Sequence, residues 1–392
     1  MTKNYPENVI KIAKILSDNG HSAYAVGGCI RDLIMGRTPN DWDMTTDCSP
    51  EDMIRIFDSA GVRTIPTGLK HGTVSILIDG EIYECTTFRI DGSYTDSRHP
   101  DAVTFTTDIT EDLRRRDFTV NAMAGDPLSV DGEIVDAFGG REDVEKKMIR
   151  AVGDPEKRFT EDALRILRAI RFATVLDFEI EDETKQAAIR LSERLSSVSA
   201  ERKSVELQKI LLSPHADRGI SLLLETDTAK YIHPDISLPR VSLSTLPCRF
   251  ATRLAALFGS VPSLSCMKLS NETVKAVKLL CDDILFDETT AKFESTDATA
   301  RLMLAKYGEI APDAALLRGQ IHLAEAIASE KEKSPCISLG DLAVRGNDLI
   351  GAGIEAKKLG NIMSHLLLSV IEDQSLNQKD TLISIARDLE TR

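Results

Sequence analysis

Two aspartates one residue apart, Asp41 and Asp43, follow closely after a Gly-Gly-Cys-Ile-Arg-Asp string. On an extended segment, side chains at positions i and i+2 point to the same side of the chain. Two carboxylates placed in this way are close enough to share divalent metal ions, and carboxylate oxygens are ligands that Mg²⁺ prefers. A tight turn followed by a solvated loop would explain either motif alone, but the combined string is far more specific.

The residues before this pair predict a phosphate-binding turn. Residues 23–26 are an expected short strand, and Gly27 and Gly28 turn the chain into a helix that begins near Cys29. Free N–H groups at such a turn attract phosphate, and the Arg31 guanidinium adds a planar, permanently charged donor. A phosphate-binding turn shortly before a carboxylate pair is what metal-assisted phosphoryl or nucleotidyl transfer needs.

The composition predicts an enzyme of a reducing cytoplasm with several domains. The chain has 392 residues, of which 42% are hydrophobic, and this length suggests two to four domains. No apolar run approaches the roughly 18 residues that a membrane span requires, so we expect no membrane association. The seven cysteines are scattered without a Cys-x-x-Cys pair, which argues against disulfides and structural zinc.

The charge distribution predicts that nucleic acid, if bound, contacts one basic part of the chain. The formal net charge is −14, which argues against non-specific binding because phosphate neutralisation dominates such affinity. Residues 146–171, however, carry eight lysines and arginines against four acidic residues. A solvated helix face would also explain this basic segment. Net charge does not exclude binding of nucleic acid there, because the local electrostatic field at a groove decides it.

The hydrophobic pattern predicts a mixed sheet with helices over about residues 20–140. Two strands, 74–77 and 82–88, flank an Asp79-Gly80 hairpin turn, and Ser49 is a plausible N-cap for a following helix. Residues 90–100 are polar and predict a loop. After residue 140 the helical period dominates, and no convincing strand follows.

Several ordered blocks resemble the class II tRNA nucleotidyltransferases and the bacterial poly(A) polymerases. They are the Gly-Gly-x-x-Arg-Asp and Asp-x-Asp strings, followed by residues 115–122, 153–165 and 167–172. Residues 342–350 look like the tail region of CCA-adding enzymes. The resemblance implies an α/β nucleotidyltransferase head with a mixed sheet, similar to the palm of DNA polymerase β, followed by an all-α neck, body and tail. The expected bounds are 1–140 for the catalytic head, 141–210 for the neck with a base-selecting helix, 211–310 for the body and 311–392 for the tRNA-binding tail.

The resemblance also implies roles for residues in the head. Asp41 and Asp43 would hold Mg²⁺, and Glu84 occupies the position of a third catalytic carboxylate; the alternative for Glu84 is an outward-facing strand residue. Nucleotide binding is implied for four further residues, with Arg116 on the phosphates, Asp117 and Asn121 on the ribose hydroxyls, and Gly28 in the turn. An Asp near the first turn of any helix is the structural alternative for Asp117.

Asp162 and Arg165 are predicted to select the base. They are three residues apart on an expected helix, so their side chains would be neighbours. A carboxylate that accepts from an amino group and a guanidinium that donates to a ring nitrogen suit cytosine and adenine, whereas guanine and uracil present the reverse pattern. A simple intrahelical ion pair is the alternative. Arg168 and Arg171 continue the same face, and the resemblance suggests that they border the nucleotide.

These features predict addition of CCA to the 3′ end of tRNA from CTP and ATP by a monomer or homodimer. A poly(A) polymerase has a similar head and neck, but such relatives often carry a long basic extension, and residues 350–392 are nearly balanced in charge. A CC-adding or A-adding enzyme is a second alternative, although CC-adding relatives look shorter in the loop at residues 90–100. A metal-dependent phosphohydrolase would not need a base-reading pair. A non-catalytic RNA-binding protein would have no reason to keep all of these residues.

Overall fold

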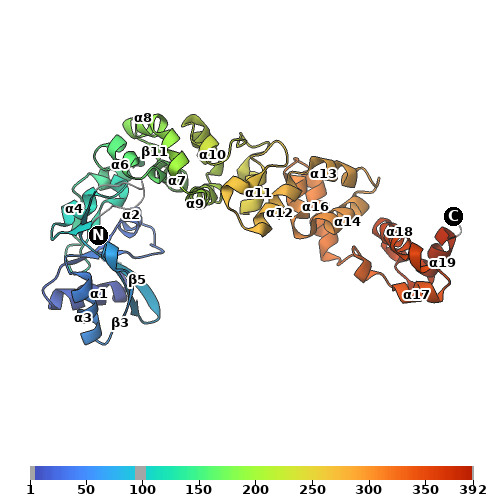
Figure 1. Ribbon diagram of the computed structural model, residues 1–392, viewed down its shortest axis with the longest axis horizontal. Helices are drawn as coiled ribbons and strands as arrows, with labels where there is room; N and C mark the ends of the chain where they lie inside the picture. Colours follow the sequence, from blue (N-terminus) through green and yellow to red (C-terminus); the bar gives the residue numbers. More distant parts are fainter. Residues whose placement is uncertain (1–4, 93–102, 391–392) are drawn as a thin grey trace. The chain divides into compact units, whose positions relative to one another are not determined.

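The computed structural model describes residues 5–92 and 103–390 and divides into two compact units, residues 1–234 and 235–392 (Figure 1). The first unit contains a seven-stranded sheet in the order β3-β4-β5-β2-β1-β8-β9. All neighbouring strands are antiparallel except β2 and β5, which run parallel, so the sheet is mixed as predicted. The strands are β1 Ala23–Val26, β2 Met44–Thr46, β3 Arg63–Gly68, β4 Thr73–Ile78, β5 Glu81–Thr87, β8 Ala124–Gly125 and β9 Ile134–Val135.

Local signals fix the ends of several elements in this sheet. The hairpin between β4 and β5 turns at Asp79 and Gly80, which both have positive φ, and this confirms the predicted turn. Ser49 caps α3 by accepting a hydrogen bond from the backbone N–H of Asp52, as predicted, and Pro50 occupies the first helical position. The helices of the first unit are α1 Glu7–Asp18, α2 Gly28–Ile34, α3 Pro50–Ser59, α4 Ile109–Arg114, α5 Gly140–Glu145, α6 Pro155–Glu161, α7 Leu164–Leu176, α8 Asp182–Arg190, α9 Ala200–Leu211 and α10 Ala216–Glu225.

Two short pairings depart from the sequence-based prediction. The expected loop at residues 90–100 begins instead as β6, Arg89–Asp91, which pairs with β7, Val103–Phe105. The rest of that predicted loop lies outside the described residues. Two-residue parallel strands, β10 at Met148–Ile149 and β11 at Glu179–Ile180, interrupt the helical region. Such strands are too short for a period of two to be visible in the sequence.

In the described part of the second unit, every regular element is a helix. Arg301 in α14 is buried, pairs with Glu330 in α16 and donates to the last carbonyl groups of α18, so it joins three helices. Between residues 5 and 92 and between 103 and 390, every helix is too short or too polar to cross a membrane. The helices of this unit are α11 Phe250–Ala255, α12 Asn271–Leu280, α13 Asp283–Thr290, α14 Thr296–Tyr307, α15 Ala311–Leu316, α16 Ile321–Glu332, α17 Gly346–Gly351, α18 Leu359–Glu372 and α19 Lys379–Glu390.

Candidate active site

A polar cavity of about 690 Å³ opens in the first unit, and seven arginines and five aspartates line it. The excess of positive charge distinguishes it from the acidic chain as a whole. The structure brings together here every residue predicted for the site except Glu84. Those that line the cavity are Gly28, Arg31, Asp41, Asp43, Arg116, Asp117, Asn121, Asp162, Arg165, Arg168 and Arg171.

Asp41 and Asp43 lie immediately before β2, and both side chains are exposed in the cavity. The strand proper begins at Met44, but the carbonyl of Asp43 accepts a hydrogen bond from Val26 N at 2.9 Å and so extends the pairing with β1. Surrounding protein atoms reduce the hydration of the Asp43 carboxyl and raise its pKa. The guanidinium of Arg116 opposes this shift in pKa, and the negative charges of Glu84 and Asp41 add to it.

Glu84 lies on β5, exposed and outside the cavity lining. Because Met44 pairs with Cys85, the strand register places Glu84 beside the backbone of Asp43. Within the described part of the chain, no three Asp, Glu, His or Cys side chains are arranged to hold a metal ion together. The role of Glu84 as a third carboxylate therefore stays a prediction.

The chemistry of Asp41 and Asp43 fits a magnesium ion. Both offer hard carboxylate oxygens from one short segment, which is the kind of donor that Mg²⁺ prefers. The raised pKa of Asp43 reflects in part the negative charge around it, which a bound divalent cation would offset.

The glycine turn brings the backbone close to two guanidinium groups. Gly27 has φ +84°, and a Cβ at this position would lie 3.2 Å from Nη1 of Arg116. Arg31 donates to the Asn121 side-chain oxygen at 2.7 Å and pairs with Asp32 at 2.8 Å. These two arginines supply positive charge at the turn.

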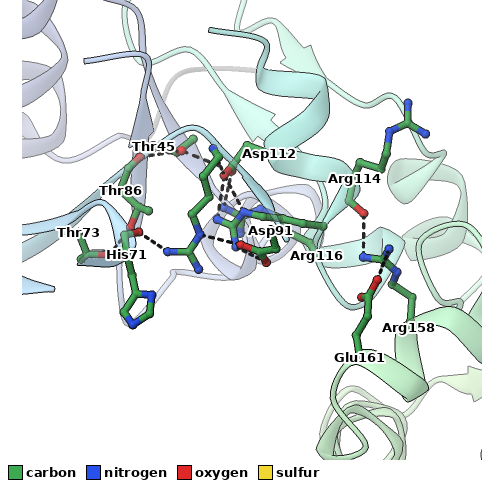
Figure 2. Close-up of polar contacts among 12 residues, drawn as sticks. Thr45, His71, Thr73, Thr86, Asp91, Asp112, Arg114, Arg116, Arg158 and Glu161 are labelled. Atoms are coloured by element: carbon green, nitrogen blue, oxygen red, sulfur yellow. Dashed lines mark hydrogen bonds and ion pairs between the residues drawn. The ribbon is translucent and has the colours of Figure 1, made fainter. Parts of the chain in front are cut away.

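Asp112 is a buried carboxylate that pairs with two arginines of the cavity lining, and the sequence-based prediction missed it (Figure 2). It accepts hydrogen bonds from Arg115 at 2.8 and 2.9 Å, from Arg116 at 3.2 Å, from the Thr45 hydroxyl at 3.4 Å and from the backbone N–H of Arg89 at 3.4 Å. Burial alone would raise its pKa, but the two guanidinium groups outweigh burial and lower the pKa. Asp112 thus connects β2, β6 and the cavity arginines. Its only signal in the sequence is the spacing of three and four residues to the two arginines.

Asp117 is held by Arg168, which approaches it at 2.6 and 2.7 Å. It also accepts from the backbone N–H of Phe118 at 2.8 Å and from the Asn121 amide at 3.4 Å. Burial opposes ionisation of Asp117, but the positive charge and hydrogen bond of Arg168 outweigh it and lower the pKa to about 2. Asp117 lies three residues beyond the end of α4, which ends at Arg114.

The predicted pairing of Asp162 with Arg165 along one helix is wrong. The chain leaves the helical conformation at Asp162, with φ −143° and ψ 104°, so α6 ends at Glu161 and α7 begins at Leu164. The Asp162 carboxylate accepts from the Leu164 N–H at 3.0 Å and from Arg202 at 2.7 Å. The break occurs because these two donors hold Asp162 in an extended conformation.

Arg165 has a different carboxylate partner, Glu161, at 2.7 Å. Glu161 also pairs with Arg158 at 2.9 Å, and Arg158 in turn donates to the carbonyl of Arg114 (Figure 2). Asp162 and Arg165 still line the same cavity, so the structure brings the proposed base-selecting groups together without pairing them. Arg202, to which the sequence analysis gave no role, lines the cavity too.

Arg165, Arg168 and Arg171 are spaced three residues apart along α7, and all of them line the cavity. Arg171 is ion-paired with the buried Glu206 of α9 at 2.5 Å. Burial lowers the pKa of Arg171, and Glu206 opposes that shift. The α7 arginines therefore depend on carboxylates from other elements for their charge balance.

Two protein families match parts of this chain, which lie almost entirely in the first unit. The family described as "Poly A polymerase head domain" matches residues 23–150. The family described as "Probable RNA and SrmB- binding site of polymerase A" matches residues 177–238, up to the start of the second unit. The first match includes the Asp41–Asp43 pair and the Arg116–Asp117 segment.

Relatives of similar length match the whole chain. The CCA-adding enzyme of Leuconostoc mesenteroides is 34% identical over 388 residues, which cover 95% of this chain and 94% of the relative. That of Limosilactobacillus fermentum is 36% identical over 390 residues, with the same shares covered. The solved structure of the Bacillus stearothermophilus CCA-adding enzyme in complex with CTP has a TM-score of 0.79 at 32% identity and covers 97% of this chain and 96% of that one. These similarities confirm the predicted fold class.

Proposed function

This chain belongs to the CCA-adding enzymes, and from that premise we propose that it adds cytidine and adenosine from CTP and ATP to the 3′ end of tRNA with release of pyrophosphate. The observation that carries the proposal is that Asp41 and Asp43 line the same cavity as seven arginines. Carboxylates suit a metal ion and arginines suit a triphosphate, so the two halves of a nucleotidyl transfer site are combined.

In this proposal Asp41 and Asp43 hold Mg²⁺. When bound, the metal would polarise the reacting phosphate and favour deprotonation of the attacking hydroxyl. Arg116 and Arg31 line the same cavity and would neutralise charge on the triphosphate. Asp117 and Asn121 would accept and donate hydrogen bonds at the ribose hydroxyls, which would favour NTPs over dNTPs.

We assign base selection to Asp162 and Arg165. The carboxylate would accept from the amino group of cytosine or adenine, and the guanidinium would donate to the adjacent ring nitrogen. In the described state these groups are occupied by Arg202 and Glu161. A base would therefore have to share or replace those partners, and only a base with the matching donor and acceptor pattern compensates for their loss.

The test is incubation with tRNA transcripts that end before CCA, with each NTP offered singly and in pairs, followed by sequencing of the products. CTP alone should add two residues and then stop, and further addition of ATP should complete the third. Long adenosine ladders on any RNA 3′ end would instead indicate a poly(A) polymerase. Products that end at CC even with ATP present, or that require a preformed CC end, would indicate a CC-adding or an A-adding enzyme.

A further inference from the structure

Phe172 of α7 lies among three of the cavity arginines. The central guanidinium carbons of Arg171, Arg168 and Arg31 lie 3.8, 5.4 and 5.6 Å from the centroid of its ring. All three distances fall within the range in which the negative face of an aromatic ring attracts a cation. Phe172 is 8% exposed and lines the cavity, so the ring lies at the site rather than deep in the core.

The ring is itself fixed in place. It packs edge-to-face against Phe118, with 5.8 Å between ring centroids and an interplanar angle of 76°, and Phe118 is fully buried. Phe118 follows Asp117 directly, so the support of the ring and the carboxylate partner of Arg168 come from the same segment. The ring thus has one defined orientation relative to α7 and to the Asp117 segment.

Three guanidinium groups around one ring repel one another, and this repulsion has to be offset before a ligand arrives. Each arginine has a carboxylate partner, which is Asp32 for Arg31, Asp117 for Arg168 and Glu206 for Arg171. Arg168 and Arg171 are already neighbours on α7, whereas Arg31 comes from α2 and its carboxylate partner lies on α2 as well. Ion pairing therefore does not bring Arg31 to the two α7 arginines. The Phe172 ring is the group that all three share.

We propose that Phe172 is a positioning residue that gathers Arg31, Arg168 and Arg171 into one binding site for the phosphate groups of the incoming nucleotide. The inference rests on the proposed function, because that function supplies the triphosphate. It adds that an uncharged aromatic ring, which makes no hydrogen bond to phosphate, sets the affinity for the triphosphate. Since every NTP carries the same phosphates, the effect is independent of the base.

The experiment measures binding of CTP, ATP and tripolyphosphate by calorimetry in the presence of Mg²⁺, beside the kcat and KM of nucleotide addition. Phe172→Leu removes the aromatic face but keeps an apolar side chain. It should weaken binding of all three ligands by a similar factor, roughly threefold to tenfold. KM should rise by that factor with a smaller change in kcat, and Phe172→Tyr should restore most of the affinity. Phe57→Leu, in the core of α3 and outside the cavity, controls for the loss of a buried ring.

Replacement of residue 172 by phenylalanines of increasing fluorine content keeps the shape of the ring and weakens its negative face, so it separates positioning from packing. Affinity for tripolyphosphate should fall stepwise along this series while the thermal unfolding midpoint stays constant. A flat series, or equal losses in Phe172→Leu and Phe172→Tyr, would overturn the inference and leave the proposed function intact. A wild-type protein that binds neither nucleotide nor tripolyphosphate would overturn both.

Discussion

The carboxylate of Asp162 is ion-paired at 2.7 Å with the guanidinium of Arg202, a residue forty positions further along the chain. This contact joins the break between α6 and α7 to α9. Together with the hydrogen bond from the Leu164 N–H, it fixes the orientation of a carboxylate that lines the cavity. Asp162 is therefore held in position, as a group that reads a base has to be.

The first prediction tests base reading by Asp162. Asp162→Ala should lower kcat/KM for both CTP and ATP, because the acceptor for their amino group is lost. It should also weaken the rejection of UTP and GTP, whose carbonyl edge the carboxylate would repel. We expect selectivity to change by about 1–3 kcal/mol, or roughly tenfold to a hundredfold.

The measurement is kcat/KM for all four NTPs in the variant and the wild type. Arg190→Ala, which removes an exposed ion pair with Glu156 in the same unit, is the matched control and should leave the ratios unchanged. If Asp162→Ala lowered stability but kept wild-type ratios, its role would be limited to the contact with Arg202.

The residues of the site could largely be predicted from sequence, whereas their partners could not. Asp41, Arg116 and Asp162 belong to short motifs with fixed spacing, and the structure places all three on one cavity. The pairing of Asp162 depends on Arg202 in a different helix, and no local spacing reveals it. The three-residue spacing predicted a helical neighbour for Asp162 on the assumption of an unbroken helix. The local hydrogen bond from the Leu164 N–H and the distant one from Arg202 instead accompany a break at Asp162.

The same limit applies to the fold. Turns and caps with strong local chemistry, such as Asp79-Gly80 and Ser49, were predicted correctly because a few neighbouring residues determine them. The β6–β7 and β10–β11 pairings were missed because each depends on a partner 12 or more residues away along the chain and contains at most three residues per strand. Short strands contribute little pattern of their own.

The second prediction concerns the proposed metal ligands. Asp41→Ala and Asp43→Ala should each abolish nucleotide addition, because the bound metal would stabilise the transition state by roughly several kcal/mol. Binding of tRNA should stay nearly intact in both variants. Single-turnover rates at several Mg²⁺ concentrations and a filter-binding assay with tRNA measure the two effects. Asp47→Ala is the control, since its carboxylate contacts Ser22 and His21 rather than the cavity. Near-normal turnover of either cavity variant would mean that other residues bind the metal.

The third prediction concerns Asp112, whose buried carboxylate holds Arg115 and Arg116. Asp112→Asn keeps the size of the side chain but removes its charge, so Arg116 loses this carboxylate partner and Arg115 keeps the more distant Asp91 at 3.9 Å. We expect a loss of about 3 kcal/mol in the free energy of unfolding and a higher KM for every NTP, because Arg116 is no longer oriented. Urea denaturation and steady-state kinetics measure the two effects.

Glu111→Gln is the matched control for Asp112, because Glu111 pairs with the mostly exposed Arg114 on the same helix. This variant should change stability by less than about 1 kcal/mol. Equal stability losses in the two variants would mean that burial of Asp112 adds nothing to its pairing with the cavity arginines.

The last prediction concerns stability at low pH and follows from the pairing of Asp117 with Arg168. The pKa of Asp117 is about 2 in the folded protein, against an ordinary value of 3.8. Because the folded pKa is the lower one, the contribution of this group is fully present above pH 3.8 and is lost as the pH falls towards 2. The size of this contribution is on the order of 2 kcal/mol.

Asp117→Asn should therefore lower the free energy of unfolding at pH 7 by more than it does at pH 2.5. Denaturant titrations across this window measure the difference, and a gap that stayed constant with pH would show that ionised Asp117 does not stabilise the fold through Arg168.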